Sequence, residues 1–338
     1  MLRKTFLPSL SLALSLGLAL AAAVSAQAAD KVSIVYIPKN TGNPYFDSLV
    51  KGFQDGCAKV GCDFDMQAPA TAEATSQIPF ITAQTQRGVG VIAISPNSPD
   101  ALNQVLDRAR SRGILVLAVN GDLVGNLDHR DAGILPVDFT KTGPSQVELL
   151  GSQINYEGEI AILSATTDAP DQNTWIAAMK DSLASNPKYA KMKLVAVAYG
   201  DDDPQKSTTE MEALIQKYPN LKGVISPTTV GVAAAAQVLQ TQGKAKQITL
   251  TGLGTPNQMR PFIKDGTLKA FQLWSPYNEG LLTSYFAVGV KNGTIKNEPG
   301  TKFEVPGLGE ITVGADHIIN TQAELTTFDA GNIDQFNF

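Results

Sequence analysis

The stretch Val35-Tyr-Ile-Pro-Lys-Asn-Thr-Gly-Asn-Pro-Tyr-Phe46 decides how the rest of the chain is interpreted. It completes a run of alternating β-branched residues from Lys31 to Ile37, which predicts a strand. Residues 38–44 hold two Pro, two Asn and one Gly, a composition typical of a turn. Asn43 suits a helix N-cap and Pro44 suits the first helical turn. The stretch therefore predicts a strand, a polar loop and a helix.

The loop in this unit is a candidate binding segment. In an open α/β sheet, ligands bind just outside the carboxyl ends of the strands, where such loops lie. A cation, amides and aromatic rings together suit a small polyhydroxylated ligand. Phe46 taken alone also fits the core of the helix that follows, because apolar residues recur at helical spacing from there to Phe53. The loop and the start of the helix offer Lys39, Asn40, Asn43, Tyr45 and Phe46.

Strands alternate with helices over most of the chain, which predicts parallel sheets of the doubly wound kind. Two such halves favour two lobes with a hinge and a cleft between them. The predicted strands cover 31–37, 63–66, 89–94, 114–119, 134–137, 159–163, 194–199, 223–225, 248–252 and 270–273. Beyond the first helix, the predicted helices cover 75–87, 101–112, 142–155, 175–183, 205–217, 232–242, 257–264 and 281–291.

Polar loops recur where the strands of both halves end. If both sheets point their carboxyl edges at one cleft, these loops converge there. This convergence is the basis of the functional hypothesis. The loops cover 38–44, 95–100, 120–122, 164–174, 226–229 and 274–278.

The first 28 residues have the pattern of a secretory signal peptide. Arg3 and Lys4 precede an apolar run from Leu7 to Val24, and Ala26-Gln27-Ala28 has the form of a cleavage site. We therefore expect export to the periplasm and no direct insertion of the mature protein into the membrane. Residues 1–28 take no part in the predicted fold.

The length and charge of the mature chain indicate the number of domains and exclude some kinds of partner. About 310 residues remain after cleavage, which is the usual size of two domains. The chain has 27 basic and 32 acidic residues, and losing two cations with the leader changes its formal charge from −5 to −7. This charge argues against nucleic acid or an anionic membrane as a partner.

The only two cysteines are Cys57 and Cys62, on either side of Gly61, where we expect the first helix to end. After export they would meet an oxidising compartment, so a local disulfide is one alternative and two free thiols the other. Such a small loop would stabilise little. Metal binding is disfavoured, because His129 and His317 are distant in sequence and two cysteines alone close no zinc site.

Motifs for catalysis and cofactor binding are missing. No G-x-S-x-G, G-x-G-x-x-G, P-loop or H-E-x-x-H pattern occurs in a suitable context, and no nucleophile lies beside a histidine. The acidic run Asp201-Asp202-Asp203 is bounded by Gly and Pro and is interpreted as a solvated turn. We therefore expect neither an enzyme nor a cofactor.

Several strings resemble the periplasmic sugar-binding proteins of ABC transporters, of the ribose-binding type. The general strings are Asn43-Pro-Tyr-Phe46, Val91-Ile-Ala-Ile-Ser-Pro96 and Gly113-Ile-Leu-Val116. Others are similar to the subgroup of the autoinducer-2 receptor LsrB and the rhamnose-binding proteins. These are Ile37-Pro-Lys39, Asp171-Gln-Asn-x-Trp175, Ser226-Pro227, Thr255-Pro-Asn-x-Met-Arg-Pro261 and Leu273-Trp274. The resemblance covers essentially all of the mature chain.

This resemblance implies two α/β lobes joined by three crossings of the chain, with a sugar buried between them by hinge closure. It places residues 29–138 and 275–312 in the N-terminal lobe, and residues 139–274 and 313–338 in the C-terminal lobe. It also implies a monosaccharide ligand, a membrane permease as partner and a monomeric protein.

The resemblance further implies which residues hold the ligand. Lys39, Asp171, Gln172 and Pro227 match ligand contacts of the autoinducer-binding proteins. Asn120 stands where those proteins have Asp, and Thr229 where they have Ala. The lost carboxylate removes a charged acceptor, so these two departures favour another polyol, and L-rhamnose is the usual alternative in the family.

A sugar site needs mixed donors and acceptors, and apolar surfaces for the C–H faces of the ring. Asn120 equally suits a simple turn, and Trp274 suits either a cleft wall or the core. Trp175 is assigned to helix core and Arg260 to a tether between loops. The predicted ligand-binding residues are Lys39, Asn40, Tyr45, Phe46, Asn120, Asp171, Gln172, Asn173, Pro227, Thr229 and Trp274.

Four functions are compared. The sequence favours a transport protein that delivers a monosaccharide, most of all L-rhamnose, to a permease. A receptor for the furanosyl signal autoinducer-2 is the alternative. The signal peptide and the missing helix-turn-helix argue against a LacI-type repressor domain. An exported sugar-modifying enzyme would need a carboxylate pair or a histidine near Asp171, and the sequence presents no obvious candidate.

Overall fold

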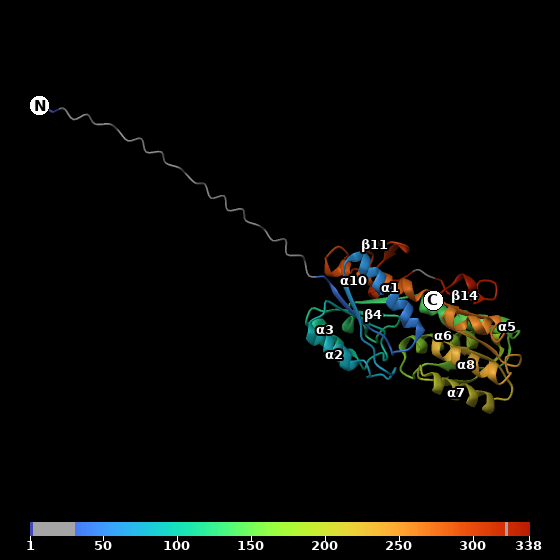
Figure 1. The fold of residues 1–338 in the computed structure, drawn as a ribbon. Coiled ribbons are helices and arrows are strands. Elements are labelled where there is room, and N and C mark those ends of the chain that lie inside the picture. The colour runs from blue at the N-terminus through green and yellow to red at the C-terminus, as the bar shows by residue number, and fades with distance from the viewer. Residues whose placement is uncertain (3–30, 322–323) are drawn as a thin grey trace. The chain divides into compact units, whose positions relative to one another are not determined.

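The computed structural model describes residues 1–2, 31–321 and 324–338 (Figure 1). The predicted signal peptide lies, beyond its first two residues, outside this described part. Two parallel sheets with helices on both faces organise residues 31–338, which form one compact unit. This arrangement confirms the predicted α/β class with two parallel-sheet lobes.

The first sheet has six strands in the order β13-β5-β4-β3-β1-β2, and every neighbouring pair is parallel. The strand predicted from the opening stretch, β1, lies inside this sheet, so its polar loop leaves from the interior of the carboxyl edge. The strands are β1 (Ser33–Ile37), β2 (Asp63–Met66), β3 (Val91–Ile94), β4 (Leu115–Val119), β5 (Ala132–Leu135) and β13 (Ile318–Asn320).

Alternate residues of the central strands enter different cores. Ile34 and Tyr36 of β1 pack with α1, whereas Val35 and Ile37 pack in a second core with α2 and α3. Both faces of β1 are therefore buried, as expected of a parallel strand. Figure 1 shows α2 and α3 on one side of this sheet and α1 on the other. The helices of this first lobe are α1 (Pro44–Val60), α2 (Ile78–Arg87), α3 (Asn103–Ser111), α4 (Asn126–His129) and α10 (Pro276–Lys291).

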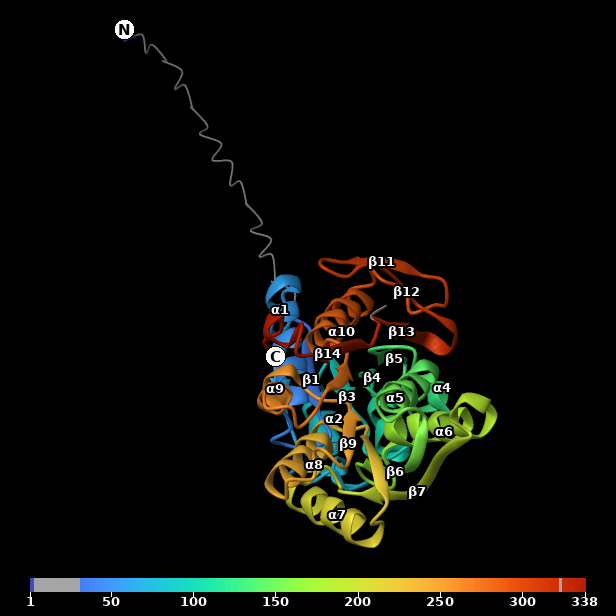
Figure 2. The ribbon, with the colours of Figure 1, turned by 90° about the vertical axis from the view of Figure 1, so that its right-hand side faces the viewer.

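The second sheet has four parallel strands in the order β7-β6-β8-β9. An isolated bridge between Leu253 and Gln272 connects it to β10, which pairs with β14 in antiparallel fashion. Helices α5 and α6 pack together, as do α7 and α8 (Figure 2). The strands are β6 (Glu157–Ser164), β7 (Lys191–Tyr199), β8 (Leu221–Ser226), β9 (Thr249–Gly252), β10 (Ala270–Leu273) and β14 (Thr326–Asp329). The helices of this second lobe are α5 (Phe139–Gln153), α6 (Pro170–Ser185), α7 (Pro204–Lys217), α8 (Thr229–Thr241) and α9 (Pro256–Lys264).

Helices α6 and α8 begin earlier than the sequence predicts. Asp171 and Gln172, expected in a polar loop, lie in the first turn of α6, and Thr229 is the first residue of α8. Apolar periodicity misses the start of α6 because residues 171–173 are polar. It misses the start of α8 because Thr229 and Gly231 offer no apolar side chain. Pro170, at the position that favours helix initiation, is the local signal for the start of α6.

The C-terminal region corrects the predicted limits of the lobes. The sequence resemblance predicts residues 318–320 in the C-terminal lobe, but they form β13 beside β5 in the first sheet. Residues 326–329 do join the second lobe through β10. A hairpin of β11 (Lys302–Val305) and β12 (Gly309–Thr312), absent from the predicted elements, precedes β13. The short strand Ile318-Ile-Asn320 has too little periodicity to reveal its partner.

Close contact between α1 and α10 fixes one wall of the first lobe. A Cβ atom on Gly52 would lie 2.0 Å from the Tyr277 carbonyl oxygen, and one on Gly280 would lie 2.1 Å from the Leu49 carbonyl oxygen. Only glycine permits this approach, because any side chain would overlap the opposite backbone. The contact packs the start of α10 against the middle of α1.

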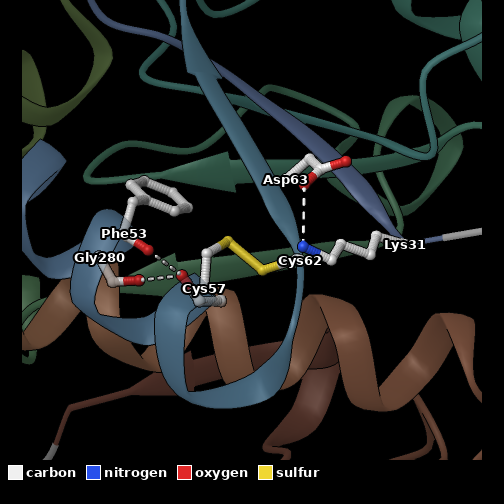
Figure 3. Close-up of a disulfide and its surroundings, with 7 residues drawn as sticks. Lys31, Phe53, Cys57, Cys62, Asp63 and Gly280 are labelled. Atoms are coloured by element: carbon white, nitrogen blue, oxygen red, sulfur yellow. Dashed lines mark hydrogen bonds and ion pairs between the residues drawn. A yellow bond between two sulfur atoms is a disulfide. The ribbon is translucent and has the colours of Figure 1, made fainter.

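The end of α1 confirms one prediction and decides between two alternatives. Gly61 is the left-handed C-cap, with φ of 78°, and its N–H donates to the Cys57 carbonyl. This tight turn returns the chain so that Cys57 and Cys62 form a disulfide across the helix end (Figure 3). The disulfide alternative therefore holds.

We expect the double substitution Cys57→Ser with Cys62→Ser to lower the free energy of unfolding by about 2 kcal/mol or less, because the bond closes a very small loop. Urea unfolding under oxidising conditions measures the effect. Wild-type protein with reducing agent is the control and should match the variant. A loss above about 4 kcal/mol would contradict this view of the disulfide as a local clip.

Candidate functional site

Loops and helix starts from both lobes line a partly open cavity. The space between its lining atoms, open solvent included, is about 340 Å³. The first lobe contributes the loop after β1 and the residue after β4. The second lobe contributes the first turns of α6 and α8, and Trp274 follows β10. The lining residues are Lys39, Asn43, Tyr45, Phe46, Asn120, Asp171, Gln172, Trp175, Asp202, Pro227, Thr228, Thr229, Leu253, Leu273 and Trp274.

Most of the predicted ligand-binding residues meet here. Nine of them line the cavity: Lys39, Tyr45, Phe46, Asn120, Asp171, Gln172, Pro227, Thr229 and Trp274.

The other two predicted residues, Asn40 and Asn173, do not line the cavity. The Asn40 amide donates to the Asp202 carbonyl at 3.3 Å, and the Asn173 amide donates to the Thr167 carbonyl at 2.7 Å. Both side chains therefore hold loops in place.

A buried ion pair forms part of the cavity lining. Lys39 Nζ is 2.5 Å from Asp171 Oδ1 and donates to Gln172 Oε1 at 2.9 Å. The side chains of Lys39 and Asp171 are only 3% and 0% exposed. Asp171 also lies near the positive end of the α6 dipole, which favours its negative charge. Since Lys39 belongs to the first lobe and Asp171 to the second, the pair joins the two lobes.

The amide of Asn120 extends this polar cluster. Its Nδ2 donates to Asp171 Oδ2 at 3.4 Å, and its Oδ1 lies 2.7 Å from the Tyr45 hydroxyl. The backbone at Asn120 is left-handed, with φ of 63°, a conformation that Asn tolerates well. Asn120 is therefore both a turn residue and a cavity residue, so the two interpretations of it are compatible.

Aromatic side chains form the apolar part of the wall. The Trp274 indole N–H donates to the Tyr45 hydroxyl at 2.8 Å, and the two rings meet edge to face. Trp175 lies edge to face against Trp274 and also lines the cavity. The prediction of Trp175 as helix core alone is therefore incomplete. Its position four residues after Asp171 could have revealed it, because that spacing places both on one face of α6.

Asp202 corrects the interpretation of residues 201–203 as a solvated turn. Its side chain is buried, accepts a hydrogen bond from the Thr228 hydroxyl and lines the cavity. Burial raises the pKa of Asp202, while the charge of Lys39 opposes that shift. The place of this run directly after the strand β7 was the signal that composition concealed.

A further hydrogen bond crosses between the lobes at Thr229. Its hydroxyl donates to Asn43 Oδ1 at 2.8 Å, and the same oxygen accepts the Tyr45 N–H at 3.0 Å as the N-cap of α1. The predicted cap at Asn43 is confirmed. Thr229, predicted as a ligand contact, is thereby also a contact between the two lobes.

The described residues contain neither a cluster of metal ligands nor a membrane-spanning helix. Among residues 1–2, 31–321 and 324–338, no group of three or more His, Cys, Asp or Glu side chains could hold a metal ion. Within the same residues, no helix is long and apolar enough to cross a membrane.

The predicted tether at Arg260 is present, since its guanidinium donates to the Phe336 and Ile333 carbonyls.

Comparison with known proteins identifies the class. Residues 34–294 match the periplasmic binding protein domain family, so the chain belongs to that family. Within it, the chain falls with sugar-binding proteins of ABC transporters, which are non-enzymatic transport components. The architecture expected from the sequence resemblance is thus confirmed at family level.

Three solved structures show the range of similarity. A sugar ABC transporter protein from Actinomyces odontolyticus is 39% identical, with 90% of this chain and 97% of that chain covered and a TM-score of 0.72. A solute-binding protein from Clostridium phytofermentas with bound L-rhamnose is 32% identical, with 90% and 98% covered and a TM-score of 0.86. LsrB from Clostridium saccharobutylicum in complex with AI-2 is 23% identical, with 91% and 100% covered and a TM-score of 0.84, and shows the fold alone.

The ion pair across the lobes predicts a measurable coupling. In unfolding by urea, we expect the coupling free energy between Lys39→Met and Asp171→Asn to be about 1.5 kcal/mol or more, because each single change leaves the other polar group buried without its partner. The double variant completes the cycle. Coupling near zero would mean that the ligand-free lobes are apart in solution.

Proposed function

We propose that this protein is the substrate-binding component of an ABC sugar importer, and that it captures L-rhamnose between its lobes. The observation that carries the proposal is the mixed lining of the cavity. It combines the hydrogen-bonded group Lys39, Asp171 and Gln172 with the aromatic pair Trp274 and Tyr45. A chain that is 32% identical over almost its whole length binds L-rhamnose, which supports this choice of sugar.

The chemistry of the cavity suits a neutral sugar. Each sugar hydroxyl both donates and accepts, and a buried hydroxyl without partners is costly. Lys39 supplies a donor, Asp171 supplies acceptors, and the amides of Asn120 and Gln172 supply both. The edges and faces of the tryptophans can cover the C–H groups of the ring and the methyl group of rhamnose.

The ion pair explains how binding would be linked to closure. Lys39 and Asp171 are buried only when the lobes are together. Each side chain can also form hydrogen bonds in addition to the ion pair. A sugar between them would supply further hydrogen bonds to both lobes at once. Binding would therefore favour the closed arrangement by hinge motion.

The proposal includes the wider setting of the protein. We propose export to the periplasm through the signal peptide, action as a monomer and delivery of the sugar to a membrane permease. Family membership supports the compartment and the transport role.

Autoinducer-2 is the alternative ligand, and two residues argue against it. Asn120 is a neutral amide where the resembling receptors have a carboxylate. The Thr229 hydroxyl bonds Asn43 across the lobes, a contact that alanine cannot make. Both differences lie at the cavity and change its hydrogen bonding.

Calorimetry with a panel of L-rhamnose, D-ribose, D-arabinose and autoinducer-2 tests the function. We expect L-rhamnose to bind most tightly, and Asp171→Ala to weaken binding about tenfold to a few hundredfold, because a charged partner of a buried ligand is lost. Asp168→Ala removes an exposed acid just before α6, three residues from Asp171, and is the matched control. Unchanged affinity in a folded Asp171→Ala protein would remove Asp171 from the site, and no binding of any sugar would overturn the proposal.

The choice of ligand is tested by a reciprocal change. We expect Asn120→Asp combined with Thr229→Ala to gain affinity for autoinducer-2 and lose affinity for L-rhamnose, each by roughly tenfold. The physical reason is that a charged acceptor binds hydroxyl donors about twice as strongly as a neutral one. Each single variant serves as a control. Tight autoinducer-2 binding by the unaltered protein, with no rhamnose binding, would promote the signalling alternative.

A further inference from the structure

The Tyr45 hydroxyl, beside the cavity, has three close partners. It accepts a hydrogen bond from the Trp274 indole N–H at 2.8 Å. It also lies 2.7 Å from Asn120 Oδ1 and 2.8 Å from Glu279 Oε2. A hydrogen bond from the hydroxyl to Asn120 Oδ1 needs one proton, and a hydrogen bond between the hydroxyl and Glu279 Oε2 needs another. The tyrosine hydroxyl carries only one proton. The three contacts therefore require a second proton.

The orientation of Asn120 shows where the tyrosine proton goes. Asn120 Nδ2 faces Asp171 Oδ2 at 3.4 Å, so its NH2 group must point at that carboxylate and its Oδ1 must point at Tyr45. An amide oxygen carries no hydrogen, so the Tyr45 proton serves Asn120. The remaining proton must then belong to Glu279, which donates to the Tyr45 oxygen.

The surroundings of Glu279 favour this neutral state. Its side chain is completely buried, in the first turn of α10. The titratable groups that face it are Tyr36 on β1, Tyr45 on α1 and Asp171 on α6. None is a cation. Burial raises the pKa of Glu279 to about 8. Hydrogen bonds from the Tyr45 side chain and the Asn120 backbone oppose this shift, and the charge of Asp171 adds to it by a smaller amount.

We propose that Glu279 is kept as a neutral carboxylic acid that donates its proton to Tyr45, and that this fixes the amide of Asn120 with its NH2 group toward Asp171 and the bound ligand. Glu279 is a positioning residue, because it acts through Tyr45 and Asn120. The proton on Glu279 then sets the direction of each hydrogen bond in the chain from Glu279 through Tyr45 and Asn120 to Asp171. The role in binding rests on the proposed function, whereas the protonation state does not.

The network has a defined response to pH. When Glu279 loses its proton, the Tyr45 hydroxyl donates its hydrogen bond to the Glu279 carboxylate. Asn120 Oδ1 then no longer receives a hydrogen bond from Tyr45. A second negative charge then lies near Asp171. Affinity should therefore be full below the pKa of Glu279 and fall as the pH rises through it. Tyr36 and Tyr45 stay neutral in this range, since burial raises the pKa of both well above 10.

The proton itself can be measured without a ligand. NMR of protein labelled with ¹³C at the glutamate carboxyl carbons, titrated from pH 5 to pH 10, should show one buried carboxyl that changes state near pH 8. The same signal should be absent from Glu279→Gln, which assigns it. A Glu279 signal that titrates below pH 6 would overturn the proposal, even if no sugar in the panel bound.

Calorimetry with L-rhamnose tests the positioning role. We expect wild-type affinity to be about tenfold weaker at pH 9 than at pH 7, because the neutral fraction of Glu279 falls from about nine-tenths to about one-tenth. Glu279→Gln keeps a donor for Tyr45 without titrating, so its affinity should stay within about threefold of wild type at pH 7 and should not fall at pH 9.

Two further variants complete the test. Glu279→Leu has no donor and should bind weakly at both pH values. Asp202→Asn removes the other buried acid with a raised pKa and should retain the fall between pH 7 and pH 9. A fall that persists in Glu279→Gln, or disappears in Asp202→Asn, would overturn the role of Glu279.

Discussion

The buried ion pair between Lys39 and Asp171 is the interaction on which the arrangement of the lobes depends. Two charges removed from water are tolerated only when each finds an opposite charge and further hydrogen bonds. Neither lobe can satisfy this requirement alone, because the cation belongs to one and the carboxylate to the other. The two charges therefore neutralise each other where the lobes meet. A ligand in the cavity would use the hydrogen-bonding positions of Lys39 and Asp171 that the ion pair leaves available.

The close contact between α1 and α10 positions residues that are linked to this ion pair by hydrogen bonds. Gly52 and Gly280 let the two backbones approach more closely than any side chain would permit. As a result, Tyr45 on α1 and Glu279 on α10 meet beneath Asn120, which in turn faces Asp171. The polar network thus runs from the packed interior of the first lobe to the ion pair in the cavity lining.

Local patterns predicted much of this structure. Alternating β-branched residues located β1, and Asn43, Pro44 and Gly61 located the ends of α1, because capping depends on neighbouring residues alone. Nine of the eleven predicted site residues line the cavity. Periodicity failed where the apolar signal is weak or very short, as in the first turns of α6 and α8 and the strand β13.

The sequence by itself determined the alternation of strands and helices, the polar loops at the strand ends and the mixed chemistry of the site. These features follow from backbone preferences and from residues close together along the chain. Only the tertiary structure decided that Asp202 is buried, that Trp175 reaches the cavity and that Glu279 lies against Tyr45. Burial and protonation depend on groups far apart in sequence, and the packing of two lobes is what brings them together.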